Sequence, residues 1–142
     1  MPILSQFEQY VHGVIESGGA LGADEMSHHL AGLFKRGYGA AVEMDEARDG
    51  ITWAQFSHLY ADFYVYQYAS GIAVANALAA NVRANGDEAA ANYRRFLSAG
   101  SSVYALDALK IAGADLSSSE PMDRAFKVLE GFVDRLEQLI EQ

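Results

Sequence analysis

The stretch from Thr52 to Ala80 constrains the fold most, because it contains a single formal charge, Asp62. An amphipathic surface helix would show one apolar stripe and one charged face. Here aromatic residues instead recur on more than one side of a helix, and small residues, mostly alanine, follow them. The pattern predicts a long central helix that is buried on all sides. It would begin with a capping box of Thr52 and Gln55 and end at Gly86, which tolerates a left-handed conformation.

The other segments also show helical periodicity, and no segment alternates polar and apolar residues over the length of a strand. Caps, glycines and apolar spacing predict further helices over Leu4–Ser17, Asp24–Gly37, Glu88–Ala99, Tyr104–Ala112 and Pro121–Ile140. The acidic segment Glu43–Gly50 has few apolar residues and is predicted to be a loop. The sequence therefore predicts an all-α fold, a helical bundle of about five to six helices around a long aromatic and alanine-rich central helix.

Length and composition favour one domain. A chain of 142 residues that is 51% hydrophobic can close one core, so a single helical domain over residues 1–142 is expected. The lack of cysteine excludes disulfides and thiolate metal sites and suits the cytoplasm. A net charge of −9 argues against nucleic acid or an anionic membrane as a partner. The amino terminus resembles neither a signal peptide nor a membrane span, so we expect a soluble protein.

Four tyrosines crowd the aromatic part of the central stretch: Tyr60, Tyr64, Tyr66 and Tyr68. A buried hydroxyl without a partner costs about 1–3 kcal/mol, so these groups either satisfy one another and the backbone or face a polar cavity. In a cavity beside His58 they could donate to a developing oxyanion or bind a peptide backbone. The alternative for His58 is a core histidine whose ring is satisfied by Asp62, one turn later.

Metal ligands are weakly indicated. Glu8 and His12 are four residues apart, and Glu25 and His28 are three apart, so a Glu/His site in a helical hairpin is conceivable. Further inward carboxylates are missing, and exposed polar residues are the preferred interpretation. The chain also lacks H-E-x-x-H, the P-loop, G-x-G-x-x-G and G-x-S-x-G.

The string from Trp53 to Gly71, W-x-x-F-x-H-x-Y-x-x-F-Y-V-Y-Q-Y-A-S-G, resembles the carboxy-terminal signature of the oligoendopeptidase F family of zinc metallopeptidases. The likeness continues through Asn92–Gly100 (NYRRFLSAG) and Ala105–Leu116 (ALDALKIAGADL), and upstream through Phe7–His12 (FEQYVH). It therefore covers nearly the whole chain in the right order. Ala105 stands where relatives often have proline, which affects a turn and not the chemistry.

The resemblance implies half of a catalytic site. In that family the two histidines of H-E-x-x-H and a downstream glutamate hold the zinc, and the glutamate of the motif is the general base. None of these residues lies in this chain, so no metal ligand is expected here, and the resemblance places them on the amino-terminal side of Met1. The resemblance assigns oxyanion stabilisation, the catalytic role, to His58 with one or both of Tyr64 and Tyr66. It assigns substrate binding or packing to Tyr60 and Tyr68.

The expected function is therefore that of the carboxy-terminal part of a metallo-oligopeptidase that cuts short peptides, unable by itself to bind catalytic zinc or hydrolyse a peptide bond. The rival hypothesis is a self-standing helical module for protein interaction or oligomerisation. Because apolar surfaces that met a missing half would lie bare, a homo-oligomer is expected.

Overall fold

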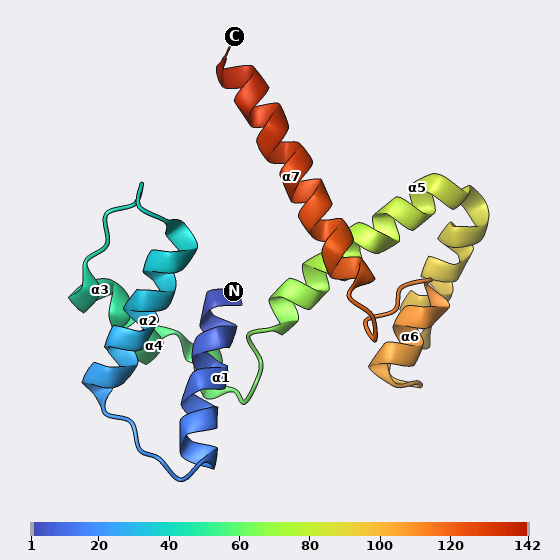
Figure 1. Ribbon diagram of the computed structural model, residues 1–142. Coiled ribbons are helices and arrows are strands. Elements are labelled where there is room, and N and C mark those ends of the chain that lie inside the picture. The colour runs from blue at the N-terminus through green and yellow to red at the C-terminus, as the bar shows by residue number, and fades with distance from the viewer. Residues whose placement is uncertain (1, 142) are drawn as a thin grey trace. The chain divides into compact units, whose positions relative to one another are not determined.

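The computed structural model describes residues 2–141, and these residues form seven α-helices and one 3-10 helix, without a strand (Figure 1). The elements in chain order are α1 (Pro2–Glu16), α2 (Ala23–Tyr38), α3 (Glu46–Gly50), α4 (Thr52–Gln55), the 3-10 helix η1 (Ser57–Tyr60), α5 (Gln67–Ala99), α6 (Ala105–Ile111) and α7 (Glu120–Ile140). The prediction of an all-α fold is confirmed. Within the described residues no helix has both the length and the apolar character needed to cross a membrane.

The chain divides into two compact units, Met1–Ala69 and Ser70–Gln142. The boundary falls just inside the first turn of α5. We describe each unit by itself, and the expectation of a single domain over residues 1–142 stays a prediction.

The first unit closes a core of large apolar side chains between α1, α2 and the segment that precedes α5. Its buried members are Leu4, Phe7, Leu30, Leu33 and Val65. Trp53, Phe56 and Leu59 are partly buried and pack against these residues. The short elements α4 and η1 are therefore held by the apolar faces of the first two helices.

The predicted continuous helix from Thr52 is wrong, because the chain leaves helical geometry twice before α5. Phe56 is extended (φ −83°, ψ 93°), and Phe63 has a positive φ of 47°. Phe56 and Val65 are nine positions apart. In one continuous helix with 3.6 residues per turn, the side chains of Phe56 and Val65 would therefore lie on opposite faces. Both contact the same core, so the helix must break. The capping box is wrong too, since Ile51 is the N-cap of α4 and no side chain caps it.

The predicted loop at Glu43–Gly50 contains the helix α3. The side chain of Asp45 caps it by accepting hydrogen bonds from the backbone N–H groups of Ala47 and Arg48, at 3.1 and 3.2 Å. Gly50 is buried so close to the backbone carbonyl of Ser27 that a Cβ atom would clash there. The packing of α3 against α2 thus relies on a glycine, which an apolar-periodicity argument does not detect.

The second unit is built around α5, which continues through a kink to Ala99 (Figure 1). Gly86 causes the kink with φ 61° and ψ −133°, a conformation that favours glycine. The sequence predicts that one helix ends at Gly86 and that another follows it. In the structure the helix changes direction at Gly86 and then continues as part of α5. The buried apolar residues of this unit are mostly small: Ala73, Val74, Ala77, Leu78, Ala89, Ala108, Ala112 and Ala114.

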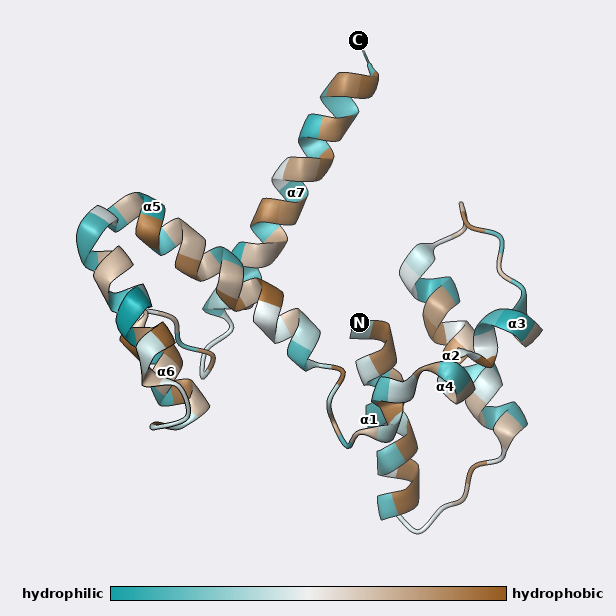
Figure 2. Ribbon diagram, turned by 180° about the vertical axis from the view of Figure 1, so that it is seen from behind, coloured by the Kyte–Doolittle hydropathy of each residue, from teal (hydrophilic) through white to brown (hydrophobic). Residues whose placement is uncertain are grey.

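The last helix, α7, begins as predicted with Pro121 in its first turn. Apolar and polar residues alternate along it with helical spacing (Figure 2). Its apolar stripe is nevertheless exposed, and includes Phe126, Leu129, Phe132, Leu136 and Ile140.

Candidate functional site

His58 lies at the centre of an aromatic cluster in the first unit. Its Nδ1 atom is 3.2 Å from the Tyr68 hydroxyl, and the two rings stack with centroids 5.5 Å apart. The rings of Tyr64 and Phe56 meet the imidazole edge-on, at 5.1 and 5.2 Å. The break between η1 and α5 is what allows one side chain from η1, one from the turn and one from α5 to meet.

Val65 anchors the turn that carries the tyrosines. It is fully buried in the core, whereas the residues on either side of it, Tyr64 and Tyr66, are exposed. The turn is closed by a hydrogen bond of 3.0 Å from the backbone N–H of Tyr64 to the carbonyl of Ala61. A buried apolar residue between two exposed tyrosines therefore presents both phenol groups at the surface.

The predicted burial of the tyrosines is wrong. Tyr60 is 70% exposed and Tyr66 is 52% exposed, so neither side chain is buried. The Tyr60 hydroxyl donates to the carbonyl of Ala54 at 3.3 Å. Of the two alternatives for these hydroxyls, an open polar site agrees with the exposure better than a sealed core does.

Desolvation and the neighbouring Tyr64 hydroxyl raise the pKa of Tyr68 above its ordinary value of 10.0. Tyr68 is therefore a neutral phenol near neutral pH, and its single hydroxyl proton has two neighbouring acceptors, the Tyr64 hydroxyl and Nδ1 of His58. When it donates to Nδ1, the neutral imidazole carries its proton on Nε2, which becomes a donor.

Among the described residues, Asp62 is paired with His12 and not with His58, the partner that the alternative interpretation gives it. Its Oδ1 atom is 3.6 Å from Nε2 of His12, a residue of α1. The ring of His12 also lies 4.4 Å from that of Phe63, whose positive φ places it there. The interaction that was expected within one helix instead joins two distant segments.

The weak metal hypothesis finds no support, because no group of three or more His, Asp or Glu side chains in the described part of the chain could hold an ion. His28 contacts Glu46 of α3 at 2.6 Å, and Glu25 accepts from the backbone N–H of Gly22 at 2.8 Å. The preferred interpretation, exposed polar residues, is nevertheless wrong for Glu8, which is 3% exposed. Leu4, Phe7, Glu8 and Val11 share one face of α1, so the helical spacing could have indicated its burial.

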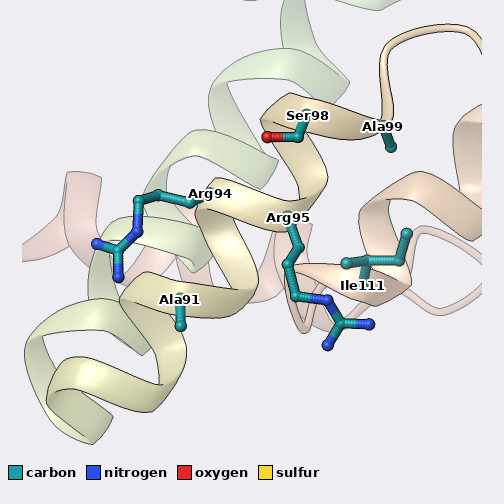
Figure 3. Close-up of a pocket in the computed structure, with 6 residues that line it drawn as sticks. All are labelled: Ala91, Arg94, Arg95, Ser98, Ala99 and Ile111. Carbon is teal, nitrogen blue, oxygen red and sulfur yellow. The ribbon is translucent and has the colours of Figure 1, made fainter.

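A pocket of about 460 Å³ in the second unit holds two arginines, Arg94 and Arg95, beside small side chains (Figure 3). The guanidinium groups point in different directions, Arg95 toward Ile111 and Arg94 away from it (Figure 3). Arg95 also donates to the side chain of Asn92 at 3.3 Å. The two cations therefore do not converge on one anion.

The imidazole of His58 and the two phenols that it contacts, Tyr64 and Tyr68, are donors of the kind that hydrolases direct at a developing oxyanion. Comparison with known proteins agrees with this class. Residues 1–128 match peptidase family M3. The chain therefore belongs to peptidase family M3, whose members are generally zinc-dependent.

Individual relatives support this assignment. Oligopeptidase PepF of Bacillus subtilis is 35% identical over 138 residues, which are 97% of this chain and 20% of that protein. The plasmid-encoded oligoendopeptidase F of Lactococcus lactis subsp. cremoris is 33% identical over 138 residues, 97% of this chain and 23% of that protein. The crystal structure of oligoendopeptidase-F from Enterococcus faecium matches with a TM-score of 0.90 and 32% identity, over 98% of this chain and 26% of that one.

The resemblance to oligoendopeptidase F is thus confirmed. The chain spans about a fifth to a quarter of the length of these relatives.

Proposed function

We propose that this chain supplies the oxyanion-stabilising side of a zinc-dependent oligoendopeptidase that cleaves short peptides, and that it hydrolyses no peptide by itself. The observation that carries the proposal is the contact of 3.2 Å between His58 Nδ1 and the Tyr68 hydroxyl, within the motif that resembles the family signature. Family membership supports the reaction class.

The roles of the side chains follow from the hydrogen-bond chemistry. Tyr68 donates to Nδ1 and so holds the imidazole with Nε2–H free to donate to the carbonyl oxygen of a scissile peptide. Tyr64 and Tyr66, on the turn anchored by Val65, supply phenolic donors to the same oxygen. Tyr60 contributes an exposed ring for substrate contact. The contact with His58 gives Tyr68 a positioning role in addition to the substrate-binding role expected from the sequence.

Zinc does not fit the described residues, since they hold no set of three ligands. We therefore propose that the metal and its general base belong to residues that the relatives have outside the matched segment. This part of the proposal predicts that the purified chain, incubated with zinc and a quenched fluorescent peptide, shows no turnover. Steady hydrolysis that a chelator abolishes would contradict it.

A chimera tests the donor roles. This chain would replace the matched segment of the Bacillus subtilis relative, and His58→Gln would be compared with the unmodified chimera. Loss of a transition-state donor should lower kcat by about 10²–10³ with little change in KM. Tyr38→Phe, at an exposed position on α2, is the matched control and should leave both constants unchanged. An active His58→Gln chimera would refute the proposed role.

The rival function, an oligomerisation module, is favoured by α7, whose large apolar side chains are exposed. We propose that a second copy of the chain covers this stripe and that the chain is a homo-oligomer. Light scattering should then show a dimer or larger species, and Leu136→Glu should reduce its mass. A monodisperse wild-type monomer would contradict the proposal.

We also propose a cytoplasmic protein with neither nucleic acid nor a membrane as partner. The lack of cysteine and the net charge of −9 support this.

A further inference from the structure

Phe63 has an unfavourable backbone conformation. Its φ of 47° lies in the left-handed region, which a bulky residue with a Cβ atom rarely adopts. Such a conformation persists only where surrounding contacts hold it, and residues of this kind are frequent at functional sites. Phe63 lies between η1 and α5, in the segment that joins His58 to the tyrosines of the candidate site. The contacts that hold Phe63 therefore bear on the geometry of that site.

The turn that contains Phe63 runs from Ala61 to Tyr64. The backbone N–H of Tyr64 closes it by donating to the carbonyl of Ala61 at 3.0 Å, and Asp62 and Phe63 are its two central residues. Both central residues contact His12 of α1. The Nε2 atom of His12 is 3.6 Å from Oδ1 of Asp62, and its ring centroid is 4.4 Å from that of Phe63. One side chain of α1 therefore touches both central residues of the turn.

The ring contact is the stronger of these two interactions. The side chain of Asp62 is 77% exposed, and an exposed ion pair contributes little because water screens it. The rings of His12 and Phe63 are tilted by 40° at their short separation, so they pack directly against each other. The imidazole ring is therefore the group that can hold Phe63 in place.

The turn brings His58 and Tyr64 together. His58 precedes the turn and Tyr64 ends it, and their rings meet edge-on with centroids 5.1 Å apart. With a negative φ at Phe63 the chain would leave the turn in another direction, and Tyr64 would be carried away from the imidazole.

We infer that His12 is a positioning residue. Its ring holds Phe63 in the left-handed conformation, and this conformation keeps the phenol of Tyr64 against His58. The contact affects catalysis only through the proposed donor role of Tyr64, so that consequence rests on the proposed function.

Nuclear Overhauser effects between ring protons measure the contact in the purified chain, because they decline steeply with distance. The effect between Tyr64 and His58 is the cross-turn effect. The effect between Phe56 and His58, whose centroids are 5.2 Å apart, is the internal reference, because both residues precede the turn. The wild type should show both effects. His12→Ala should lose the cross-turn effect and keep the internal reference.

Two further variants separate the ring contact from other roles of a histidine. His12→Phe keeps a ring against Phe63 and removes the polar contact with Asp62, so it should retain the cross-turn effect. His28→Ala is the matched control, since His28 is likewise paired with a carboxylate of another element, Glu46 of α3, at 2.6 Å. This control should keep both effects.

Four results would overturn the inference. These are a wild type without the cross-turn effect, an unchanged cross-turn effect in His12→Ala, its loss in His12→Phe, and the loss of both effects together in His12→Ala. The last result would show a general loss of structure instead of a change in the turn.

The chimera with the Bacillus subtilis relative then separates this inference from the proposed function. His12→Ala should lower kcat there with little change in KM, and His12→Phe should restore kcat. If His12→Ala lost the cross-turn effect and kept full kcat, the donor role of Tyr64 would fail, while the role of His12 in the turn would stand.

Discussion

The first unit buries large side chains, with Leu30 and Val65 fully enclosed, whereas the second unit buries mainly alanines such as Ala73 and Ala112. Burial stabilises by about 25 cal/mol per Å² of apolar surface, so large residues contribute more per position than alanines do. Alanine instead permits a close approach of helices. Among its described residues, the second unit buries only two larger apolar residues, Val74 and Leu78, and leaves many others exposed on the stripe of α7. The first unit is therefore stabilised from within, whereas the second leaves the large apolar side chains of α7 at its surface.

The largest expected effect tests this difference with a matched pair of leucines. Leu30→Ala should lower the free energy of unfolding by about 2–5 kcal/mol, because it leaves a cavity in a closed core. Leu129 of α7 is 56% exposed, and Leu129→Ala should change stability by no more than about 0.5 kcal/mol. Urea denaturation at a concentration where the chain is monomeric measures both. Similar losses in the free energy of unfolding for Leu30→Ala and Leu129→Ala would contradict the difference proposed between the two units.

A smaller effect is expected at the kink of α5. Gly86→Ala should lower the free energy of unfolding by about 1–2 kcal/mol, because its φ of 61° is strained for a residue with a Cβ atom. Gly71→Ala on the same helix should stabilise by about 0.5–1 kcal/mol, since it lies in regular helix and its added Cβ would meet no atom within 4 Å. Thermal unfolding compares the two variants. If Gly86→Ala stabilised the protein as Gly71→Ala is expected to do, the fold would not depend on the kink at Gly86.

The pH dependence of the first unit depends in part on His29, whose ring stacks on Tyr10 at 3.6 Å. Desolvation by burial, and then the charges of Arg36 and His28, lower the pKa of His29 from 6.5. The unfolded chain therefore takes up the proton first, and stability falls as the pH drops from above 6.5 through the lowered value.

His29→Phe keeps an aromatic stack and removes the titrating group. The difference in melting temperature between pH 7.5 and pH 5.5 should therefore be smaller in the variant than in the wild type. An unchanged difference would assign the acid sensitivity to other groups.

The smallest effect is expected at Asp115 of the second unit. Hydrogen bonds from the side chain and backbone of Ser117, with a further contribution from Lys110, hold the pKa of Asp115 below 3.8. The stabilisation is complete above 3.8 and disappears as the pH falls through the lowered pKa. Asp115→Asn should thus be slightly less stable than the wild type at neutral pH and match it in strong acid. A difference that persists in acid would indicate a packing effect instead.

The sequence predicted most helices and missed those that depend on packing. The limits of α1, α2 and α7 agree with prediction because glycines and a first-turn proline act on the neighbouring backbone alone. The break between Phe56 and Gln67 was missed, since it results from Val65 entering a core formed with α1 and α2. Helix α3 was missed because it is short and polar, and because the residue that packs against the backbone of Ser27 is a glycine without an apolar side chain.

The candidate site shows the same division. The sequence motif predicts that His58 and the four tyrosines are site residues. In the structure the imidazole of His58 contacts the ring of Tyr64 and the hydroxyl of Tyr68. Which hydroxyl reaches the imidazole could not be predicted, because every phenol turns with the break in the helix. The spacing of Glu8 and His12 makes Glu8 a weak candidate metal ligand, and several residues that line a cavity with it, among them Trp53 and Tyr60, lie far along the chain.

By itself the sequence determined the all-α class, the positions of most helix ends and the family to which the chain belongs, because periodicity, caps and motifs are properties of neighbouring residues. Tertiary structure alone decided where the aromatic segment leaves the helix and which groups His58 contacts. These features follow from side chains that are distant in sequence and compete for one core, where burial outweighs local helical preference.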